Sequence, residues 1–163
     1  MERRQSDLES AAGPIDRFSG EFEFLSNFYP SPLNFRGGEY FSAEHAYQAA
    51  KAESVELRER IRLCGSPDEA KILGSAIPVR PGWTESRLEV MAEILAAKFS
   101  PPSPLAQPLL ATGSRLLVEG NDWGDSFWGT VEGRGENHLG RLLMEIRTVI
   151  RSASSPERSP SRP

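Results

Sequence analysis

The segment EYFSAEHAYQAAK, residues 39–51, marks the point at which an extended stretch passes into a helix, and this helix organises the fold. Ser42 is a favourable N-cap and the alanines after it have high helix propensity, so the sequence predicts a helix that begins at Ser42. At about 100° per residue, one face of this helix carries Glu44, Tyr47, Gln48 and Lys51. The opposite face is a smooth row of alanines suited to packing.

The polar face of this helix has two interpretations. In the first, it is the solvated side of a surface helix, with Glu44 near the positive end of the helix dipole and Lys51 near the negative end. In the second, it forms one wall of a cleft. Segments of similar polar and aromatic composition recur elsewhere in the chain and could gather in one site, which favours the second interpretation without excluding the first.

Short strands are predicted on both sides of this helix in the sequence. Alternating apolar residues indicate a strand near residues 15–18, and residues 33–35 and 39–41 indicate a hairpin around Arg36-Gly37-Gly38. Residues 115–119, RLLVE, are predicted as a further strand.

The remaining regular structure is predicted to be helical. Residues 66–69, SPDE, supply an N-cap, a proline at the first helical position and a glutamate at the third. Thr84 and Asn137 are N-cap candidates for two later helices with apolar residues at helical spacing. The predicted helical spans are 55–63, 67–77, 84–99, 105–112 and 138 onward. The fold class is therefore α+β, predominantly helical with a few short strands, in a single domain.

The chain of 163 residues has the size and composition of one globular domain. Residues 1–14 are polar and end in Gly13-Pro14, so we expect a flexible N-terminal segment. Residues 152–163 are rich in serine, proline and arginine and cannot form a core, so we expect a disordered tail. The folded unit is predicted to span residues 15–151.

Charge and composition narrow the class of protein further. The net charge of −4 argues against general polyanion binding, although it leaves room for a local basic pocket. One cysteine excludes an intrachain disulfide, and two histidines supply a zinc site poorly, so no metal is expected. No apolar run approaches 18 residues and the N-terminus lacks a signal-peptide core, so we expect a soluble cytoplasmic protein. Oligomeric state is not readable from these residues.

Three loop segments combine aromatic rings with polar side chains. Pro30 and Pro32 force the segment FLSNFYPSPL into an extended loop, and PVRPGW is a rigid loop. The segment GNDWGDSFWGTVEGRGEN contains five glycines and two tryptophans, which are costly to leave in water. The rings either plug the core or line a concave site. The side chains singled out in these loops are Asn27, Phe28, Arg80, Trp83, Asn121, Asp122, Trp123 and Trp128.

Together with Glu44 and Lys51, these side chains suit hydrolysis at an anomeric carbon. A carboxylate stabilises the positive charge of an oxocarbenium-like transition state, and a second group activates water or protonates the departing nitrogen. Rings can stack on a base, and Arg or Lys can hold a phosphate. The sequence contains no glycine-rich phosphate loop, and two scattered histidines make a serine triad a poor fit.

Eight motifs, in order, resemble those of the NADAR family, and they extend over about residues 15–151. Any one of them would be a weak signal, whereas their shared order is specific. The motifs are FLSNFYPSPL, EYFSAEHAYQAAK, SPDEAK followed by LG, RPGW, MAEILAAKF, LLATG, LVEGNDWGDSFWG and NHLGRLLMEIR.

This resemblance implies an N-glycosidase without a cofactor, acting between a phosphorylated ribose and an exocyclic amino group of a base. In one branch of the family the substrates are ribosylamino-pyrimidine 5-phosphates of early riboflavin synthesis. In another, ADP-ribose is removed from guanine in nucleic acid, which reverses a modifying toxin. A non-catalytic reader of ADP-ribose or nucleotide is a third possibility, of a different class.

The resemblance also implies roles for individual residues. Glu44 matches the catalytic glutamate of the family, which would stabilise the oxocarbenium ion or activate water. Asp122 matches an acidic position that would orient the ribose hydroxyls or share the role of base. Lys51 would meet phosphate, and in a variant mechanism it would instead attack the ring-opened sugar as an imine. The remaining substrate-binding assignments are Asn27, Phe28, Arg80, Trp83, Asn121, Trp123 and Trp128.

Overall fold

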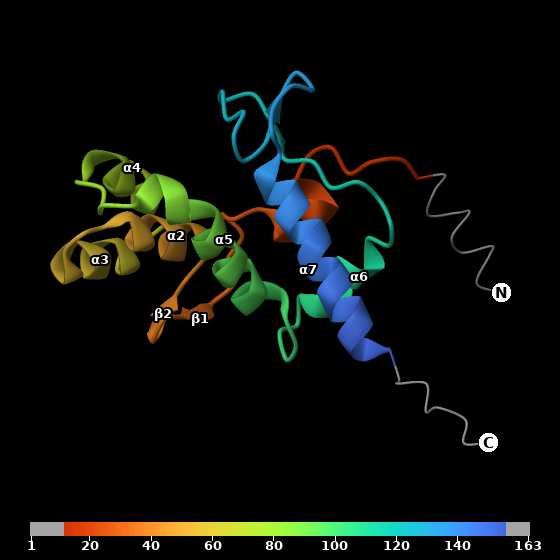
Figure 1. Cartoon of the computed structure of the whole chain (residues 1–163), viewed down its shortest axis with the longest axis horizontal. Coiled ribbons are helices and arrows are strands. Elements are labelled where there is room, and N and C mark those ends of the chain that lie inside the picture. Colours follow the sequence, from red (N-terminus) through yellow and green to blue (C-terminus); the bar gives the residue numbers. More distant parts are fainter. Residues whose placement is uncertain (1–11, 156–163) are drawn as a thin grey trace.

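A computed structural model describes residues 12–155 of the chain. In this part the protein is mainly helical, with two small two-stranded sheets, so the predicted α+β class is confirmed. Helix α5 runs through the middle of the molecule, with α2, α3 and α4 at one end and α6 and α7 at the other (Figure 1). The flexible segment and the tail predicted for residues 1–11 and 156–163 lie outside the described residues.

Residues 12–155 form one 3₁₀ helix, four short strands and six α-helices. They are η1 (Gly20–Leu25), β1 (Leu33–Phe35), β2 (Gly38–Tyr40), α2 (Ala43–Lys51), α3 (Val55–Arg62), α4 (Pro67–Ala76), α5 (Trp83–Phe99), α6 (Ala106–Ala111), β3 (Gly120–Asn121), β4 (Thr130–Val131) and α7 (His138–Ser154). Strands β1 and β2 form the predicted antiparallel hairpin, and β3 pairs with β4 in parallel.

Helices α2 and α4 begin at the serine N-caps that the sequence predicts. The Ser42 hydroxyl accepts a hydrogen bond from the His45 backbone N–H at the start of α2. The Ser66 hydroxyl does the same for Glu69 at the start of α4, and the Glu69 carboxylate accepts from the Gly65 N–H. Each cap satisfies backbone donors that the first turn of a helix leaves unpaired.

The strands predicted at residues 15–18 and 115–119 are wrong. The two segments meet only at one parallel bridge between Ile15 and Leu117. After this contact the chain turns at Gly20, whose φ of +59° is in the left-handed region, and enters η1. Two backbone hydrogen bonds hold the bridge, from Ile15 N to Leu116 O and from Val118 N to Ile15 O. Pairing therefore ends before either segment becomes a strand.

The starts of the two longest helices differ from the predicted caps. Helix α5 begins at Trp83, with Gly82 rather than Thr84 at the N-cap position. Asn137 does precede α7, but it has a φ of +52° and its side chain makes no capping hydrogen bond. Its amide instead binds the backbone of Leu117 and Glu119, so it joins the end of the glycine-rich loop to its beginning.

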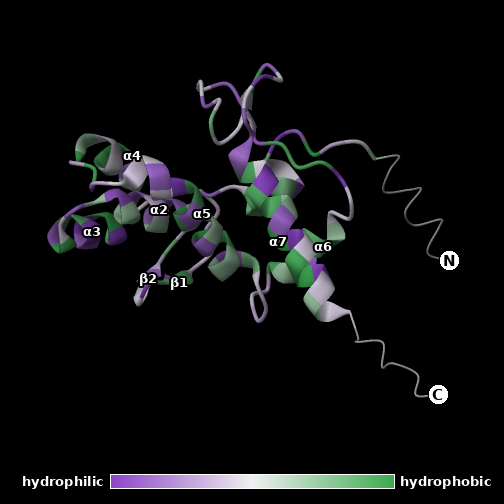
Figure 2. Cartoon of the chain, viewed as in Figure 1, coloured by the Kyte–Doolittle hydropathy of each residue, from purple (hydrophilic) through white to green (hydrophobic). Residues whose placement is uncertain are grey.

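The core lies between α5, α7 and the alanine face of α2. Met91, Ile94, Leu95 and Phe99 of α5 are at most 1% exposed and belong to the same cluster as Leu143 of α7. Hydrophobic and hydrophilic residues alternate along α7 in the pattern of an amphipathic helix (Figure 2). Within residues 12–155, no helix combines the length and the apolar character that a membrane crossing requires.

Candidate active site

The polar face of α2 is buried, which decides between its two interpretations. Glu44, Tyr47 and Gln48 are 7%, 8% and 5% exposed, so this face is not the solvated side of a surface helix. Helix α4 packs on α2 at Gly74, so closely that a Cβ atom there would lie 2.0 Å from Gln48 Oε1. Only a glycine permits this approach, and it closes one side of the site.

A chain of hydrogen bonds runs along this face. Gln48 Nε2 donates to Glu44 Oε1 at 2.7 Å, and Lys51 Nζ donates to Gln48 Oε1 at 2.9 Å. Burial lowers the pKa of Lys51, and the negative charge of Glu44 partly opposes this effect. The Gln48 amide therefore connects a half-buried amine to a buried carboxyl group.

Glu44 opens into a cavity of about 530 Å³ between the two groups of helices. A cavity of this size accommodates a small organic ligand. Its walls come from the loop after η1, from α2, α4, α5 and the start of α7, and from the glycine-rich loop before α7. The lining residues are Ser26, Asn27, Phe28, Glu44, Tyr47, Gln48, Asp68, Lys71, Met91, Glu119, Trp123, Asp125, Trp128 and Leu139.

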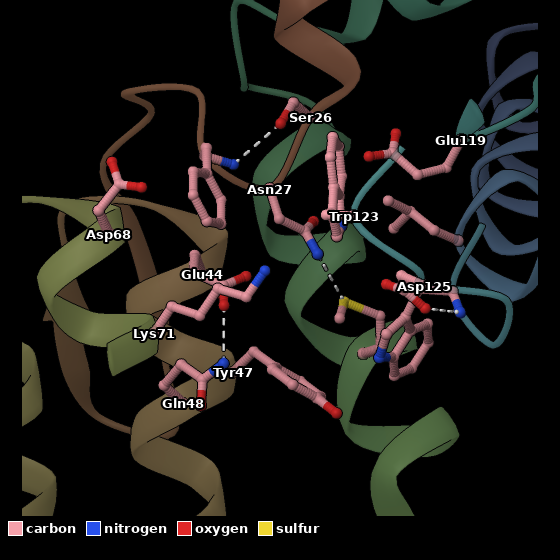
Figure 3. A pocket seen from close by; sticks show the side chains of 14 residues that line it. Ser26, Asn27, Glu44, Tyr47, Gln48, Asp68, Lys71, Glu119, Trp123 and Asp125 are labelled. Atoms are coloured by element: carbon pink, nitrogen blue, oxygen red, sulfur yellow. Dashed lines mark hydrogen bonds between the residues drawn. The ribbon is translucent and has the colours of Figure 1, made fainter. Parts of the chain in front are cut away.

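The charged side chains lie on two sides of this cavity. Figure 3 shows Glu44 and Lys71 on the side formed by α2 and α4, and Glu119 and Asp125 on the other, with Asn27 between them. The Lys71 ammonium lies 5.5 Å from the ring centre of Phe28 and 5.8 Å from that of Trp123. A cation beside two rings is suited to an anionic ligand that also carries a flat heterocycle.

Burial changes the proton affinity of two carboxyl groups in the cavity. It raises the pKa of Glu44, whereas the hydrogen bond from Gln48 and the charges of Lys71 and Lys51 oppose the rise. Burial and the charge of Asp125 raise the pKa of Glu119 to about 7. Burial also raises the pKa of the neighbouring Tyr47 phenol, to about 12.

Two polar atoms of the cavity walls are buried without a hydrogen-bond partner among the described residues. They are Asn27 Oδ1 and Glu119 Oε2. The amide nitrogen of Asn27 donates to the Met91 sulfur at 3.6 Å, which leaves its oxygen as the unused acceptor. Buried polar atoms are almost always paired, so these two atoms indicate a place where a ligand completes the hydrogen bonding.

Five of the residues singled out from the sequence line the cavity: Asn27, Phe28, Glu44, Trp123 and Trp128. They come from three separate motifs, and the fold brings them together. Trp123 is 58% exposed at the rim. Trp128 lies deeper, with its ring centre 5.5 Å from that of Tyr47.

Arg80, Trp83 and Lys51 lie behind the wall rather than in it. Arg80 donates to the Ala50 carbonyl and to the Ser86 hydroxyl, both at 2.9 Å, so it ties the end of α2 to the start of α5. Trp83 is 7% exposed and packs on Tyr47, with ring centres 5.2 Å apart. Lys51 donates its hydrogen bond to Gln48, and its charge also acts on Glu44.

In the glycine-rich loop, Asn121 and Asp122 also lie outside the cavity lining. Asn121 is buried, and its amide group binds the backbone N–H and the backbone carbonyl of Asp125. Asp122 is exposed. The acidic residue of this loop that does line the cavity is Asp125, whose Oδ1 accepts from the N–H groups of Phe127 and Trp128.

Sequence reasoning missed Lys71, Glu119 and Asp125. Lys71 lies in the SPDEAK segment, which was interpreted as a helix cap and as one of the family motifs, but no role was given to Lys71 itself. Asp125 precedes two aromatic residues in DSFW, a pattern in which an aspartate side chain commonly binds the backbone two residues on, and that signal could have found it. Glu119 ends a predicted strand just before the glycine-rich loop, which is a common position for functional side chains.

The cavity has no grouping suited to a metal ion. Among residues 12–155, no cluster of three or more His, Cys, Asp or Glu side chains has the arrangement of a metal site.

The described residues form a one-domain, mainly helical protein whose cavity is lined by carboxyl groups. The chain matches the NADAR domain over residues 16–151 and belongs to that family. The resemblance of the eight motifs is thereby confirmed.

Individual relatives are similar over most of the chain. N-glycosidase YbiA of Escherichia coli (strain K12) is 37% identical over 135 residues, which cover 81% of this chain and 84% of that protein. The NMR structure of E. coli YbiA superimposes with a TM-score of 0.80 at 32% identity and covers 92% of both chains. Riboflavin biosynthesis protein VVA0006 of Vibrio vulnificus is 40% identical over 130 residues, but the chain spans only 35% of that longer protein.

Proposed function

We propose that this protein is an N-glycosidase that hydrolyses the bond between a phosphorylated ribose and an exocyclic amino nitrogen of a pyrimidine. The substrate class is that of ribosylamino-pyrimidine 5-phosphates of riboflavin synthesis. The relatives named N-glycosidase and riboflavin biosynthesis protein support this class. A cytoplasmic location is part of the same proposal.

The observation that carries the proposal is the position of Glu44. Its carboxyl group is buried at the cavity wall, accepts a hydrogen bond from Gln48 and lies in the field of Lys71 and Lys51. Burial raises the pKa of Glu44, and the hydrogen bond from Gln48 and the charges of Lys71 and Lys51 oppose this rise by favouring the carboxylate form. A carboxylate in such a place stabilises the positive charge that develops on the sugar as the glycosidic bond breaks.

Other residues of the cavity would hold the substrate around this carboxylate. Phe28 and Trp123 would pack on the base, and Lys71 beside them would bind the phosphate. Asp125, fixed by two backbone N–H groups, would accept from the ribose hydroxyls in the role that the sequence analysis gave to Asp122. Lys51 would act indirectly, by orienting Gln48.

The test is the release of free base, followed by mass spectrometry, from two substrates in parallel. One is a ribosylamino-pyrimidine 5-phosphate, and the other is an oligonucleotide ADP-ribosylated on guanine. We expect the wild type to cleave the first, and Glu44→Gln to lower kcat by about 100-fold or more, because a neutral amide does not stabilise the cation. Glu53→Gln, an exposed substitution just beyond α2, is the matched control and should behave as wild type.

Other outcomes would replace the proposal. Cleavage of the oligonucleotide alone would make the protein an ADP-ribosyl hydrolase of nucleic acid, a function that the net charge of −4 does not favour. Binding of ADP-ribose without cleavage of either substrate would make it a reader. Glu44→Gln that folds and retains wild-type turnover would remove Glu44 from the mechanism.

A further inference from the structure

The carboxyl group of Glu119 differs from that of Glu44 in its surroundings. Glu44 accepts a hydrogen bond from Gln48, whereas no described residue donates to the Glu119 carboxyl group, and its Oε2 is buried. Leaving a buried acceptor unpaired destabilises a fold, so a purely structural role gives no reason for a glutamate here. Two carboxyl groups in one cavity with different surroundings are suited to different tasks.

The backbone of Glu119 is fixed although its carboxyl group has no partner. Its N–H donates to Asn137 Oδ1 at 3.0 Å, and its carbonyl accepts from the Thr130 N–H at 2.8 Å. Gly129 packs so closely that an added Cβ atom would lie 2.0 Å from Glu119 O and 2.9 Å from its Cγ. The side chain is therefore held at its base and presents its tip to the cavity, as a preorganised functional group does.

The charged groups around Glu119 come from four parts of the chain. Asp125 favours its protonated form, in the same direction as burial, whereas Lys98, Arg17 and Lys71 favour the ionised form. Lys98 is a weakened counter-charge, because burial lowers its own pKa to about 7 and its ammonium donates to the Ser26 carbonyl at 2.7 Å. The balance leaves Glu119 able to carry a proton near neutral pH.

We propose that Glu119 is a further catalytic residue, the general acid that protonates the departing amino nitrogen. This inference rests on the proposed function, and it assigns the second half of the reaction at the same site. Glu119 lies on the side of the cavity opposite Glu44 (Figure 3). A substrate placed between the two sides has its sugar toward Glu44 and its leaving nitrogen toward Glu119.

The step balances in atoms and electrons. The bond from the anomeric carbon to the nitrogen breaks, and its electron pair stays on the nitrogen, which takes the proton of the Glu119 carboxyl group and leaves as a neutral amine. Water adds to the anomeric carbon, and the proton it loses returns to the ionised Glu119, either directly or by way of solvent. The net reaction consumes one water and restores the protonated Glu119, and no oxidant or reductant is involved.

The experiment compares wild type, Glu119→Gln and the control Glu145→Gln, an exposed substitution on α7. Each is assayed on a ribosylamino-pyrimidine 5-phosphate and on p-nitrophenyl riboside 5-phosphate, whose leaving phenolate needs no proton. We expect Glu119→Gln to lower kcat on the amine substrate by about 100-fold or more and to lose the alkaline fall in kcat/KM near pH 7. On the nitrophenyl substrate the loss should stay within about threefold, since the leaving group no longer requires an acid.

Other outcomes would overturn either the general-acid role of Glu119 or the proposed function. Turnover of Glu119→Gln within about threefold of wild type on the amine substrate, with the alkaline fall intact, overturns the general-acid role and leaves the proposed function standing. Equal losses on both substrates also overturn it and make Glu119 a positioning residue. Wild-type enzyme without turnover of either substrate overturns the proposed function itself. Thermal unfolding of Glu119→Gln and Glu145→Gln, compared with wild type, tests whether a loss of activity comes from misfolding.

Discussion

At the scale of single residues, the chemistry of the site depends on the hydrogen-bond donors and charges around each carboxyl group. Both Glu44 and Glu119 lie near Asp125 and near cations, but Gln48 donates a hydrogen bond to Glu44, whereas no described residue donates to the carboxyl group of Glu119. The residue type is the same, so the different roles proposed for the two carboxyl groups rest on these surroundings. A group kept unpaired for catalysis lowers the stability of the protein, and this has a measurable pH dependence.

Glu119→Gln is expected to stabilise the protein above neutral pH. The pKa of Glu119 rises from 4.5 to about 7 on folding, so between these values the folded state binds a proton that the unfolded state does not. The free energy of unfolding therefore falls as pH rises through this window, and glutamine has no such dependence. At pH 8 the variant should be about 1–3 kcal/mol more stable than wild type, and the difference should shrink as pH falls toward 4.5. Urea unfolding at pH 5 and pH 8 measures both values, and no gain at pH 8 would contradict the prediction.

Lys71→Met is expected to weaken binding of the phosphate. The Lys71 ammonium is the cation beside Phe28 and Trp123 in the cavity, and a charge-assisted hydrogen bond to phosphate contributes about 1.5–3 kcal/mol. KM for the 5-phosphorylated substrate should rise by about 10-fold or more, with a smaller change for the dephosphorylated substrate. Arg141→Met, an exposed cation on α7, is the control. Equal effects on both substrates would show that Lys71 does not bind the phosphate.

At the scale of elements, the contact between α2 and α4 decides whether the site forms. Ser42 and Ser66 start these helices by local capping. The two helices can then approach because Gly74 has no side chain, and this approach buries Gln48 against Glu44. Without Gly74, α2 and α4 could each form as helices, but they could not approach closely enough to form the site.

Gly74→Ala is expected to destabilise the protein although alanine is the better helix former. The new Cβ would meet Gln48 at its Oε1, Cδ and Cβ, and the last of these cannot move without the backbone of α2. Overpacking of this kind costs about 1–3 kcal/mol, and the displaced Gln48 should also lower kcat. Ser75→Ala, exposed on the same helix, should change stability by less than about 0.5 kcal/mol. Thermal unfolding of the two variants gives the comparison, and a Gly74→Ala protein as stable as wild type would contradict the packing argument.

At the scale of the whole molecule, the cavity joins segments that are far apart in the sequence. Its walls come from residues near 27, 44, 71, 91 and 125, and these belong to both ends and to the central helix α5 of the arrangement in Figure 1. A ligand that contacts all of them binds the folded state and not the unfolded one. Binding therefore adds to the stability of the entire domain.

Ribose 5-phosphate is expected to raise the temperature of unfolding. At 100 times its Kd, a ligand specific to the folded state adds about 2.7 kcal/mol, or roughly 5–10 °C for a chain of this size. Unphosphorylated ribose at the same concentration is the control and should give a smaller shift. Differential scanning fluorimetry measures both, and equal shifts would argue against a phosphate subsite.

The sequence by itself determined the local structure and the family. Serine caps, the hairpin around Gly37 and Gly38, and the helical spacing of apolar residues depend on neighbours within a few positions, so they could be predicted. The order of the motifs pointed to the NADAR family, and the match over residues 16–151 confirms it. The two predicted strands that meet at Ile15 and Leu117 failed, because strand pairing depends on where a distant segment turns away.

Only the tertiary structure decided which polar residues share the cavity. Asp122 and Asp125 are equally acidic in the sequence, but the Asn121 amide folds their loop so that Asp125 lines the cavity and Asp122 is exposed. Lys71 lines the cavity whereas Lys51 lies behind Gln48, because the close approach at Gly74 sets the position of α4. Burial, and with it the proton affinity of Glu44 and Glu119, results from packing between distant segments, which no local pattern of residues encodes.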